Sequence, residues 1–221
     1  MTDLVQGSDE WLSARVGKVT CSNLGALLGQ VSYTSRAEAY RRARGVDTFE
    51  GNDATRWGTK NENKGIRAFE LATGFNVRAT GLHTHPEHAW LAGSPDGLVG
   101  ENGIVEVKCP YYFKRGQDSR IHTKVPGHYW MQINALLEIT DREWCAYICW
   151  TPEGVSIFDV FRDSVTFHFL LDYYKSVHQA IEQGEDIIRP LAPAEKKKIA
   201  NRVDAAIKDT VFLCESISDV K

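Results

Sequence analysis

The segment from Ser94 to Lys108 constrains the fold and chemistry of this chain more than any other. Ser94-Pro95-Asp96-Gly97 places an acid at a turn, and the apolar run Ile104-Val105-Glu106-Val107-Lys108 follows with two charges. Side chains in a strand alternate between its faces, so Glu106 and Lys108 share one face and the valines occupy the other. Lys and Glu are seldom fully buried unless they are paired. The pattern therefore predicts a strand that carries an acid–lysine pair.

Two acids near a lysine form the smallest set of groups for metal-assisted hydrolysis of a phosphodiester. Asp96 and Glu106 offer the carboxylate oxygens that a hard cation such as Mg²⁺ prefers. Lys108 can orient or deprotonate the attacking water, or stabilise developing charge. A purely structural interpretation stays open, because Glu-x-Lys on a solvated strand face and an Asp-Gly turn are both common.

With these residues the chain resembles the PD-(D/E)XK nucleases, and more closely their lambda exonuclease-like, or YqaJ-type viral recombinase, branch. The resemblance covers most of residues 6–150. It rests on motifs in the same order: Trp11 with ARVGKVTCS (14–22), WGTKNEN (57–63), GSPDGL (93–98), EVKCP (106–110) and YWMQ (129–132). It implies an α/β (α+β) fold with a restriction-endonuclease-like core, in which helices flank a central mixed β-sheet.

The resemblance also implies the composition of a metal site. Glu62 joins Asp96 and Glu106 around one or two divalent ions, and the backbone carbonyl of Val107 supplies a further ligand. The expected cofactor is Mg²⁺, with Mn²⁺ able to substitute. Gln132 is implied to help position the attacking water and Lys108. Glu62 and Gln132 also have a plain explanation as ordinary polar residues on helices.

Three further residues are implied to bind the 5′-phosphate of a DNA end: Arg15, Ser22 and Ser94. Arg15 can place its planar fork on phosphate oxygens in a way that lysine cannot. Ser22 lies near a predicted helix start, where free N–H groups and the helix dipole favour an anion. The alternative for Ser22 is a simple N-cap, and both roles are compatible.

The function implied by the resemblance is a Mg²⁺-dependent 5′-to-3′ exonuclease acting on linear double-stranded DNA. It would leave 3′ single-stranded overhangs for a single-strand annealing protein in phage-type recombination, and it would act as a ring-shaped homotrimer. One alternative is a non-processive endonuclease of restriction or repair type with the same fold. Another is a catalytically silent adaptor that binds DNA ends. The joint presence of Asp96, Glu106 and Lys108 argues against a silent protein.

Composition agrees with a folded enzyme. The 221 residues are 43% hydrophobic and 25% charged, which is typical of a soluble globular domain. No apolar run has the length of a membrane span, and the first residues lack the features of a signal peptide. We therefore expect a cytoplasmic protein without membrane contacts. The five cysteines include no Cys-x-x-Cys motif, which favours reduced thiols over disulfides or zinc.

The net charge of -3 means that any DNA-binding surface must concentrate positive charge locally. Two clusters of basic residues are candidates for this DNA-binding surface. The alternative interpretation of each is an ordinary solvated surface. They are Arg36, Arg41, Arg42 and Arg44, and then Lys108, Lys114, Arg115, Arg120 and Lys124, which lie around Tyr111, Tyr112 and Phe113. His83, His85 and His88 invite a zinc interpretation, but partly exposed polar residues are the preferred one.

The coarse pattern predicts a single domain over residues 1–221, with a peripheral helical segment from about residue 164. Predicted helices cover 8–12, 22–28, 35–44, 55–73, 127–137, 164–183 and 192–217. Predicted strands cover 75–82, 88–92, 97–99, 103–108, 144–150 and 154–161.

Overall fold

The centre of the molecule is a mixed six-stranded sheet. The computed structural model describes residues 4–47, 51–111 and 121–217. The strand order is β2-β5-β6-β7-β8-β9, and only the β6–β7 pair is parallel. The strands are β2 (Val77–Arg78), β5 (Gly97–Val99), β6 (Gly103–Lys108), β7 (Trp144–Thr151), β8 (Gly154–Phe161) and β9 (Val211–Ile217).

A second, smaller sheet has the order β1-β4-β3 and lies beside the first. Its strands are β1 (Val19–Thr20), β4 (Leu91–Gly93) and β3 (His83–Thr84). The chain passes from β4 through the Ser94–Asp96 turn directly into β5 of the central sheet. This turn therefore connects the two sheets, and it carries two of the predicted site residues.

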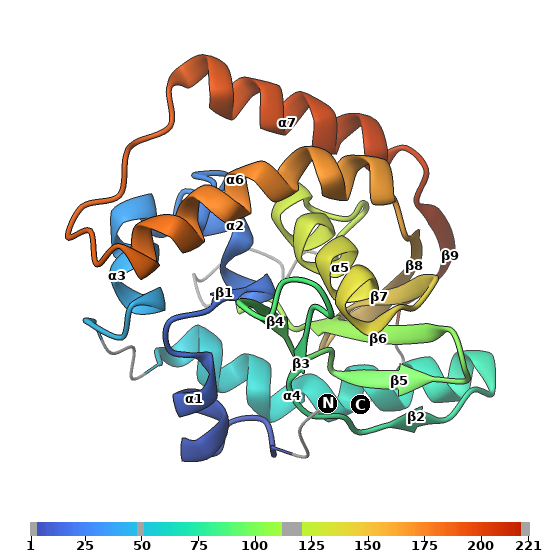
Figure 1. Cartoon of the computed structure of the whole chain (residues 1–221). Coiled ribbons are helices and arrows are strands. Elements are labelled where there is room, and N and C mark those ends of the chain that lie inside the picture. The colour runs from blue at the N-terminus through green and yellow to red at the C-terminus, as the bar shows by residue number, and fades with distance from the viewer. Residues whose placement is uncertain (1–3, 48–50, 112–120, 218–221) are drawn as a thin grey trace.

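Helices cover both faces of the central sheet, as Figure 1 shows. The long α4 (Asp53–Thr73) lies along one face, and α5 (Gly127–Thr140) packs on the other, with α6 (Ser164–Glu182) and α7 (Pro193–Ile207) outside it. The amino-terminal part adds α1 (Asp9–Arg15), a 3-10 turn (Cys21–Asn23), α2 (Leu24–Leu27) and α3 (Arg36–Ala43). The prediction of a mixed sheet flanked by helices is confirmed.

The strand β6 divides its side chains between two cores, as the alternating pattern predicted. Val105 and Val107 pack with Phe69 of α4 in one buried cluster. Ile104 belongs to the larger cluster on the α5 side. Because alternation puts Glu106 and Lys108 on the same face as Ile104, the charged pair points toward α5 rather than toward solvent. The packing of β6 thus directs its two charged side chains into the protein.

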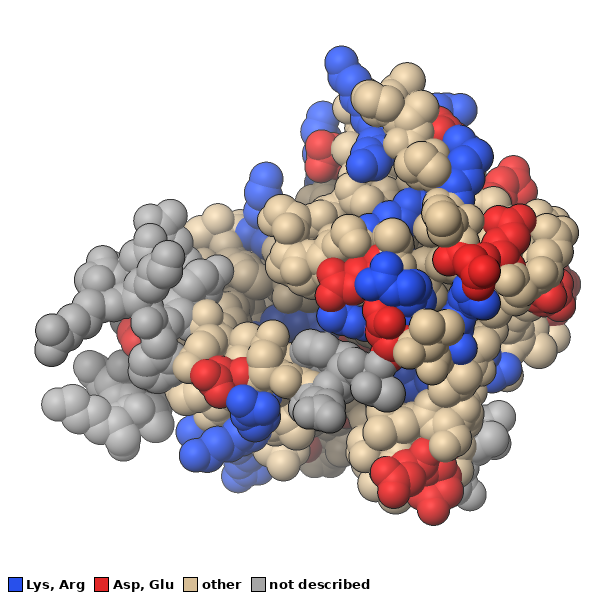
Figure 2. Space-filling view, turned by 90° about the vertical axis from the view of Figure 1, so that its left-hand side faces the viewer, with Lys and Arg blue, Asp and Glu red and all other residues tan. Residues whose placement is uncertain are grey.

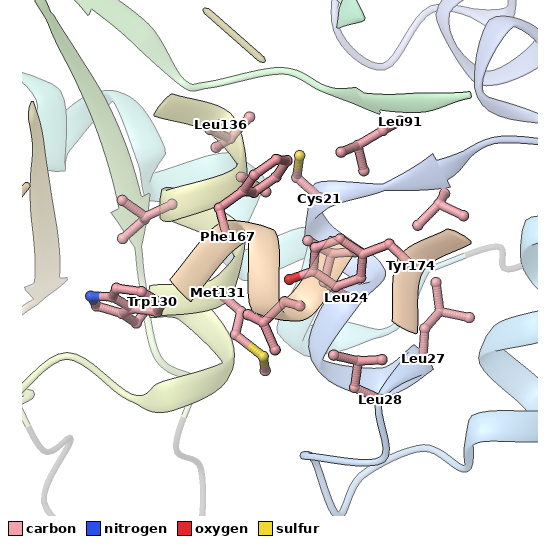
Figure 3. Packing of buried hydrophobic residues seen from close by; sticks show 14 of the residues in the cluster. Cys21, Leu24, Leu27, Leu28, Leu91, Trp130, Met131, Leu136, Phe167 and Tyr174 are labelled. Atoms are coloured by element: carbon pink, nitrogen blue, oxygen red, sulfur yellow. The ribbon is translucent and has the colours of Figure 1, made fainter. Parts of the chain in front are cut away.

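The larger core is built around α5, which is buried on nearly every side (Figure 3). Trp130, Met131 and Leu136 of this helix pack against the amino-terminal part of the chain and against α6. Their partners in the figure are Cys21, Leu24, Leu27, Leu28, Leu91, Phe167 and Tyr174. Helix α6 therefore contributes to the main core and is not peripheral. Single-domain organisation stays a prediction.

The carboxyl-terminal segment corrects another prediction. Helix α7 ends at Ile207, and Val211–Ile217 forms β9 along the free edge of β8. The predicted helix over 192–217 is therefore wrong after Ile207. The apolar run Val211-Phe212-Leu213 favours an extended chain because β-branched and aromatic residues suit strands. The predicted strand over 75–82 is also shorter than expected, since only Val77–Arg78 pairs with β5. No helix in the described part of the chain is both long and apolar enough to cross a membrane.

Gly65 allows α4 to approach β6 closely. A Cβ atom at this position would lie 2.5 Å from Cγ1 of Val107, which is packed in the smaller core. We expect Gly65→Ala to lower the free energy of unfolding by about 1–3 kcal/mol, the usual effect of overpacking. Gly58→Ala on the same helix is the matched control, because nothing lies within 4 Å of its Cβ position.

The control should raise the free energy of unfolding by roughly 0.5–1 kcal/mol through helix propensity alone. Urea denaturation of both variants measures the difference. Equal stabilisation by the two substitutions would contradict the close approach of α4 to β6.

Candidate active site

Asp96, Glu106 and Lys108 come together where the β4–β5 turn meets β6. The backbone N–H of Val107 donates to Oδ2 of Asp96 at 2.7 Å, which ties the turn to the strand. Nζ of Lys108 donates to Oε1 of Glu106 at 2.6 Å. Glu106 is only 1% exposed. The acid–lysine pair that the sequence predicted is therefore present, and it is buried rather than solvated.

Gln132 reaches the same carboxylate from α5. Its Nε2 donates to Oε1 of Glu106 at 2.6 Å, so that one oxygen receives both Gln132 and Lys108. The other oxygen, Oε2, is buried and accepts no hydrogen bond from any described residue. A buried polar atom without a partner is costly, and it marks a position where a ligand or ion would be stabilising.

The electrostatics of the site reflect three acids around one lysine. Burial, together with the charge of Asp96, raises the pKa of Glu106 to about 8 against the opposing effect of Lys108. Burial and then Asp96 raise the pKa of Glu62 to about 7. Burial also raises the pKa of Asp96, although Lys108 and the Val107 N–H oppose the shift. Glu106 and Glu62 therefore retain protons near neutral pH in this arrangement.

Lys108 responds in the opposite way. Burial lowers its pKa, but the carboxylates of Glu106 and Asp96 outweigh burial and hold the pKa above its usual value. The ammonium also lies 4.8 Å from the centre of the Tyr129 ring, a cation–π distance. Lys108 is therefore a fixed positive charge in this arrangement, suited to donating hydrogen bonds.

The side chains at this site offer the oxygen ligands that a hard divalent cation prefers. Asp96, Glu106 and Glu62 supply carboxylate oxygens, and Glu106 has one buried oxygen without a hydrogen-bond partner. Across residues 4–47, 51–111 and 121–217, no three Asp, Glu, His or Cys side chains are arranged as a ready metal site. The charges of Asp96 and Lys108 both act on the pKa of Glu62, which indicates that Glu62 lies near the same site.

The predicted phosphate-binding residues also meet, and Trp11 joins them. The guanidinium of Arg15 lies 4.0 Å from the centre of the Trp11 ring and donates to Oγ of Ser22 at 3.0 Å. Nε1 of Trp11 donates to Oγ of Ser94 at 2.9 Å. Burial lowers the pKa of Arg15 to about 10, so its charge persists at neutral pH. Ser94 lies two residues before Asp96, which places this group beside the acidic site.

The structure does not support the argument that Ser22 binds phosphate because it lies at the start of a helix. The residue lies inside a 3-10 turn, Cys21–Asn23, and the N-cap positions of this turn and of the following helix are Thr20 and Asn23 rather than Ser22. The helix that follows, α2, has only four residues, so a helix dipole contributes little there. The contact with Arg15 is what brings Ser22 into the group. The sequence analysis did not predict that Trp11 connects Arg15 to Ser94, although Trp11 was among the residues that carried the family resemblance.

The first basic cluster is largely occupied by local contacts. Its partners are the Leu27 and Arg189 carbonyls for Arg36, Asp47 for Arg41, Glu38 for Arg42 and Asp186 for Arg44. Figure 2 looks onto this end of the molecule, where Lys and Arg side chains lie beside Asp and Glu. In the second cluster, Lys114, Arg115 and Arg120 lie outside the described residues. Lys124 is exposed.

The three histidines of the zinc alternative lie in another part of the fold. His83 shares a 2.6 Å hydrogen bond with Oγ1 of Thr80, and the rings of His85 and His88 stack with centroids 4.8 Å apart. They line a surface cavity of about 610 Å³ between β3 and the facing ends of α5 and α6. Burial lowers the pKa of both His83 and His85. None of them belongs to the acidic site.

Residues 10–143, more than half of the chain, match the family model of the YqaJ-like viral recombinase domain. The chain belongs to this family. The matched segment contains every residue of the acidic site (Glu62, Asp96, Glu106, Lys108 and Gln132) and of the Arg15 group (Trp11, Arg15, Ser22 and Ser94). The YqaJ-type resemblance predicted from the motifs is confirmed.

Among curated proteins, this YqaJ-like domain is similar to an uncharacterized protein of Acanthamoeba polyphaga mimivirus, with 24% identity. The match covers 72% of this chain and 32% of the mimivirus protein, so the chain spans about a third of the length of that relative.

Solved structures share the fold. An alkaline exonuclease from Laribacter hongkongensis is 24% identical, covers 90% of this chain and 99% of its own, and superimposes with a TM-score of 0.63. The same enzyme in complex with dAMP gives 0.64. A phage-related exonuclease from Haemophilus somnus is 17% identical, covers 83% and 96% of the two chains, and gives 0.54. The YqaJ-like domain therefore has the PD-(D/E)XK fold of these exonucleases.

Proposed function

We propose that this protein is a divalent-metal-dependent exonuclease that degrades one strand of linear double-stranded DNA from 5′ to 3′. One observation carries the proposal. Glu106 is buried with Lys108 and Gln132 fixed on one oxygen, while its second oxygen has no hydrogen-bond partner among the described residues. A purely structural carboxylate would be expected to have both oxygens satisfied. Membership of the YqaJ-like family and the exonuclease fold support the same conclusion.

Each residue of the acidic site would have its own role in the reaction. Asp96, Glu106 and Glu62, with the Val107 carbonyl, would hold Mg²⁺, or Mn²⁺ in its place. A cation there would activate water and offset phosphate charge. Lys108, held protonated by its two acids, stabilises the negative charge that develops on the phosphate. Gln132 keeps the Glu106 carboxylate in a single orientation, and with it the position of Lys108.

The proposal is tested by incubating linear duplex DNA with Mg²⁺ or with EDTA. One strand of the duplex carries a label at its 5′ end in one sample and at its 3′ end in another. We expect mononucleotide release from 5′ ends, only with Mg²⁺, and accumulation of 3′ single strands. Cleavage of circular DNA would favour a restriction or repair-type endonuclease. Binding of DNA ends without any cleavage would favour the silent adaptor.

The Arg15 group supports recognition of a 5′-phosphate. We expect duplex with 5′-phosphates to be digested faster than duplex with 5′-hydroxyls, and Arg15→Ala to remove most of the difference. A hydrogen bond to a charged group contributes about 1.5–3 kcal/mol, which corresponds to roughly 10- to 150-fold in rate. Initial rates on the two substrates measure the effect.

The control for that prediction is Arg67→Ala. Arg67 lies on α4, is exposed, and pairs only loosely with Glu70 at 3.7 Å. This variant should keep the full preference for the 5′-phosphate. Equal rates on both ends for the unmutated protein would remove the phosphate site from the proposal.

The assembly and the recombination partner are proposals that rest on the family resemblance. Three copies in a ring would retain DNA by topology despite the net charge of -3. Light scattering should then give a mass near three times 24.8 kDa. A strict monomer would contradict the ring. A single-strand annealing protein would use the 3′ overhangs, and co-purification of the two proteins would test their contact.

A further inference from the structure

Three aromatic rings form a continuous path from Lys108 to the surface. The Lys108 ammonium lies 4.8 Å from the centre of the Tyr129 ring. The Tyr129 and His128 ring centroids are 4.0 Å apart. The His128 and Tyr33 ring centroids are 6.2 Å apart, with an interplanar angle of 71° that makes the pair T-shaped. Tyr33 is 72% exposed. We call Tyr33 and His128 the aromatic wall.

The packing of α2 against α5 fixes the inner half of this wall. A Cβ atom on Gly25 would lie 2.6 Å from Cβ of His128, so only glycine lets α2 approach the first turn of α5 so closely. Tyr129 is the next residue on α5, and Gln132 follows one turn later. The ring of His128 is therefore placed by the same helix that positions Gln132 on Glu106. Tyr33, from the segment between α2 and α3, extends the wall outward.

The charge state of His128 limits the kind of ligand that the aromatic wall can bind. Burial, followed by the positive charges of Lys108 and His122, lowers the pKa of His128 to about 4. The imidazole is therefore neutral at physiological pH and gives no ionic attraction to a phosphate. A neutral ring beside an exposed tyrosine matches a flat, uncharged partner, and nucleobases stack on such side chains whatever their sequence.

We propose that Tyr33 and His128 form a stacking platform for the base of a nucleotide that flanks the scissile phosphate. The inference rests on the proposed function, and it deepens that function by naming how the strand is held beside Lys108. Stacking of the flanking base would fix the sugar–phosphate backbone at the acidic site, without sequence preference. The exposed position of Tyr33 would give it first contact with the incoming strand.

The test uses duplexes whose first or second 5′ nucleotide is either normal or abasic, with KM and kcat measured separately. Tyr33→Ala should raise KM about tenfold on normal duplex, near the lower end of the range for loss of one stacked base, and have little further effect on the abasic duplex that lacks that base. The position at which the effect disappears identifies the base. Tyr33→Phe keeps the ring and should behave like the unmutated protein.

Phe161→Ala is the matched control, because Phe161 is a half-exposed aromatic at the far end of β8. It should leave KM on both duplexes unchanged. An equal loss on normal and abasic duplexes in Tyr33→Ala would overturn the platform. So would a Tyr33→Phe variant as defective as the alanine variant, because that result would assign the effect to the hydroxyl group.

Fluorescence of 2-aminopurine at the same two DNA positions measures base stacking independently of DNA cleavage. Binding of the unmutated protein in EDTA should quench the probe at one position, and Tyr33→Ala should restore most of the signal. If the unmutated protein quenches the probe but never cleaves DNA, the proposed exonuclease function fails while the platform stands. If it cleaves DNA without quenching at either position, the platform fails alone.

Discussion

Lys108→Ala is expected to reduce DNA cleavage at least about 100-fold, the lower end of the range for a group that assists proton transfer or charge stabilisation. The variant keeps Asp96 and Glu106 but loses the only cation that hydrogen-bonds to Glu106 among the described residues. The reacting phosphate would then lose the fixed positive charge beside it. Initial rates on 5′-phosphorylated linear duplex with Mg²⁺ measure the loss.

Lys208→Ala is the control, because Lys208 is an exposed lysine at the end of α7. It should cleave DNA at the unmutated rate. Circular dichroism spectra of the two variants should match that of the unmutated protein. A Lys108→Ala protein with near-normal activity would remove β6 from the proposed active site and leave the structural interpretation of the Glu106–Lys108 pair.

Glu106→Gln is expected to abolish metal-dependent cleavage, again by at least about 100-fold, because an amide is a poor ligand for a hard cation. The side chain keeps its size and the carbonyl oxygen that can accept from Lys108 and Gln132. Folding should therefore survive the change. Isothermal titration with Mn²⁺ should show weaker binding than in the unmutated protein.

The same substitution has a signature in the pH dependence of stability. In the unfolded chain Glu106 loses its proton near the usual pKa of 4.5, whereas in the folded, metal-free protein it keeps the proton up to about pH 8. Between these values the folded state binds more protons, so the free energy of unfolding falls as pH rises. Lys108 stays protonated in both states over this range.

Urea denaturation in EDTA at pH 5 and pH 8 measures that fall. It should be smaller in Glu106→Gln, which has no proton to lose at this position. Glu62 and Asp96, whose pKa values are also raised, should preserve part of the slope. An identical slope in the two proteins would mean that Glu106 is already charged in the folded state.

The strand that carries the Glu106–Lys108 pair could be predicted because its evidence is local. Alternation within β6 assigns Glu106 and Lys108 to one face, and the structure confirms it through the burial of Val105 and Val107 on the other. Arg15, Ser22 and Ser94 were predicted to bind a 5′-phosphate only through the resemblance. Trp11, which joins them, was missed because it lies 83 residues from Ser94 and meets it through a tertiary contact. Periodicity carries no information about such distant contacts.

Other features depended on partners that a local pattern does not reveal. Val211–Ile217 becomes a strand because β8 offers an unpaired edge, a fact of the whole sheet. The neutral state of His128 follows from burial and from Lys108, which lies 20 positions away in the chain. The aromatic wall likewise depends on Gly25, whose missing side chain has meaning only once α2 and α5 are packed together.

Helix α5 has a consequence for how this protein can change over evolutionary time. Most of its residues are buried, and it also carries Gln132, Tyr129 and His128. A substitution at Trp130 or Leu136 that rotated the helix slightly would displace all three at once. A second core substitution that restores the stability lost through a first one would therefore not always restore activity. Tolerated substitutions should instead concentrate on the exposed face of α4 and on α7.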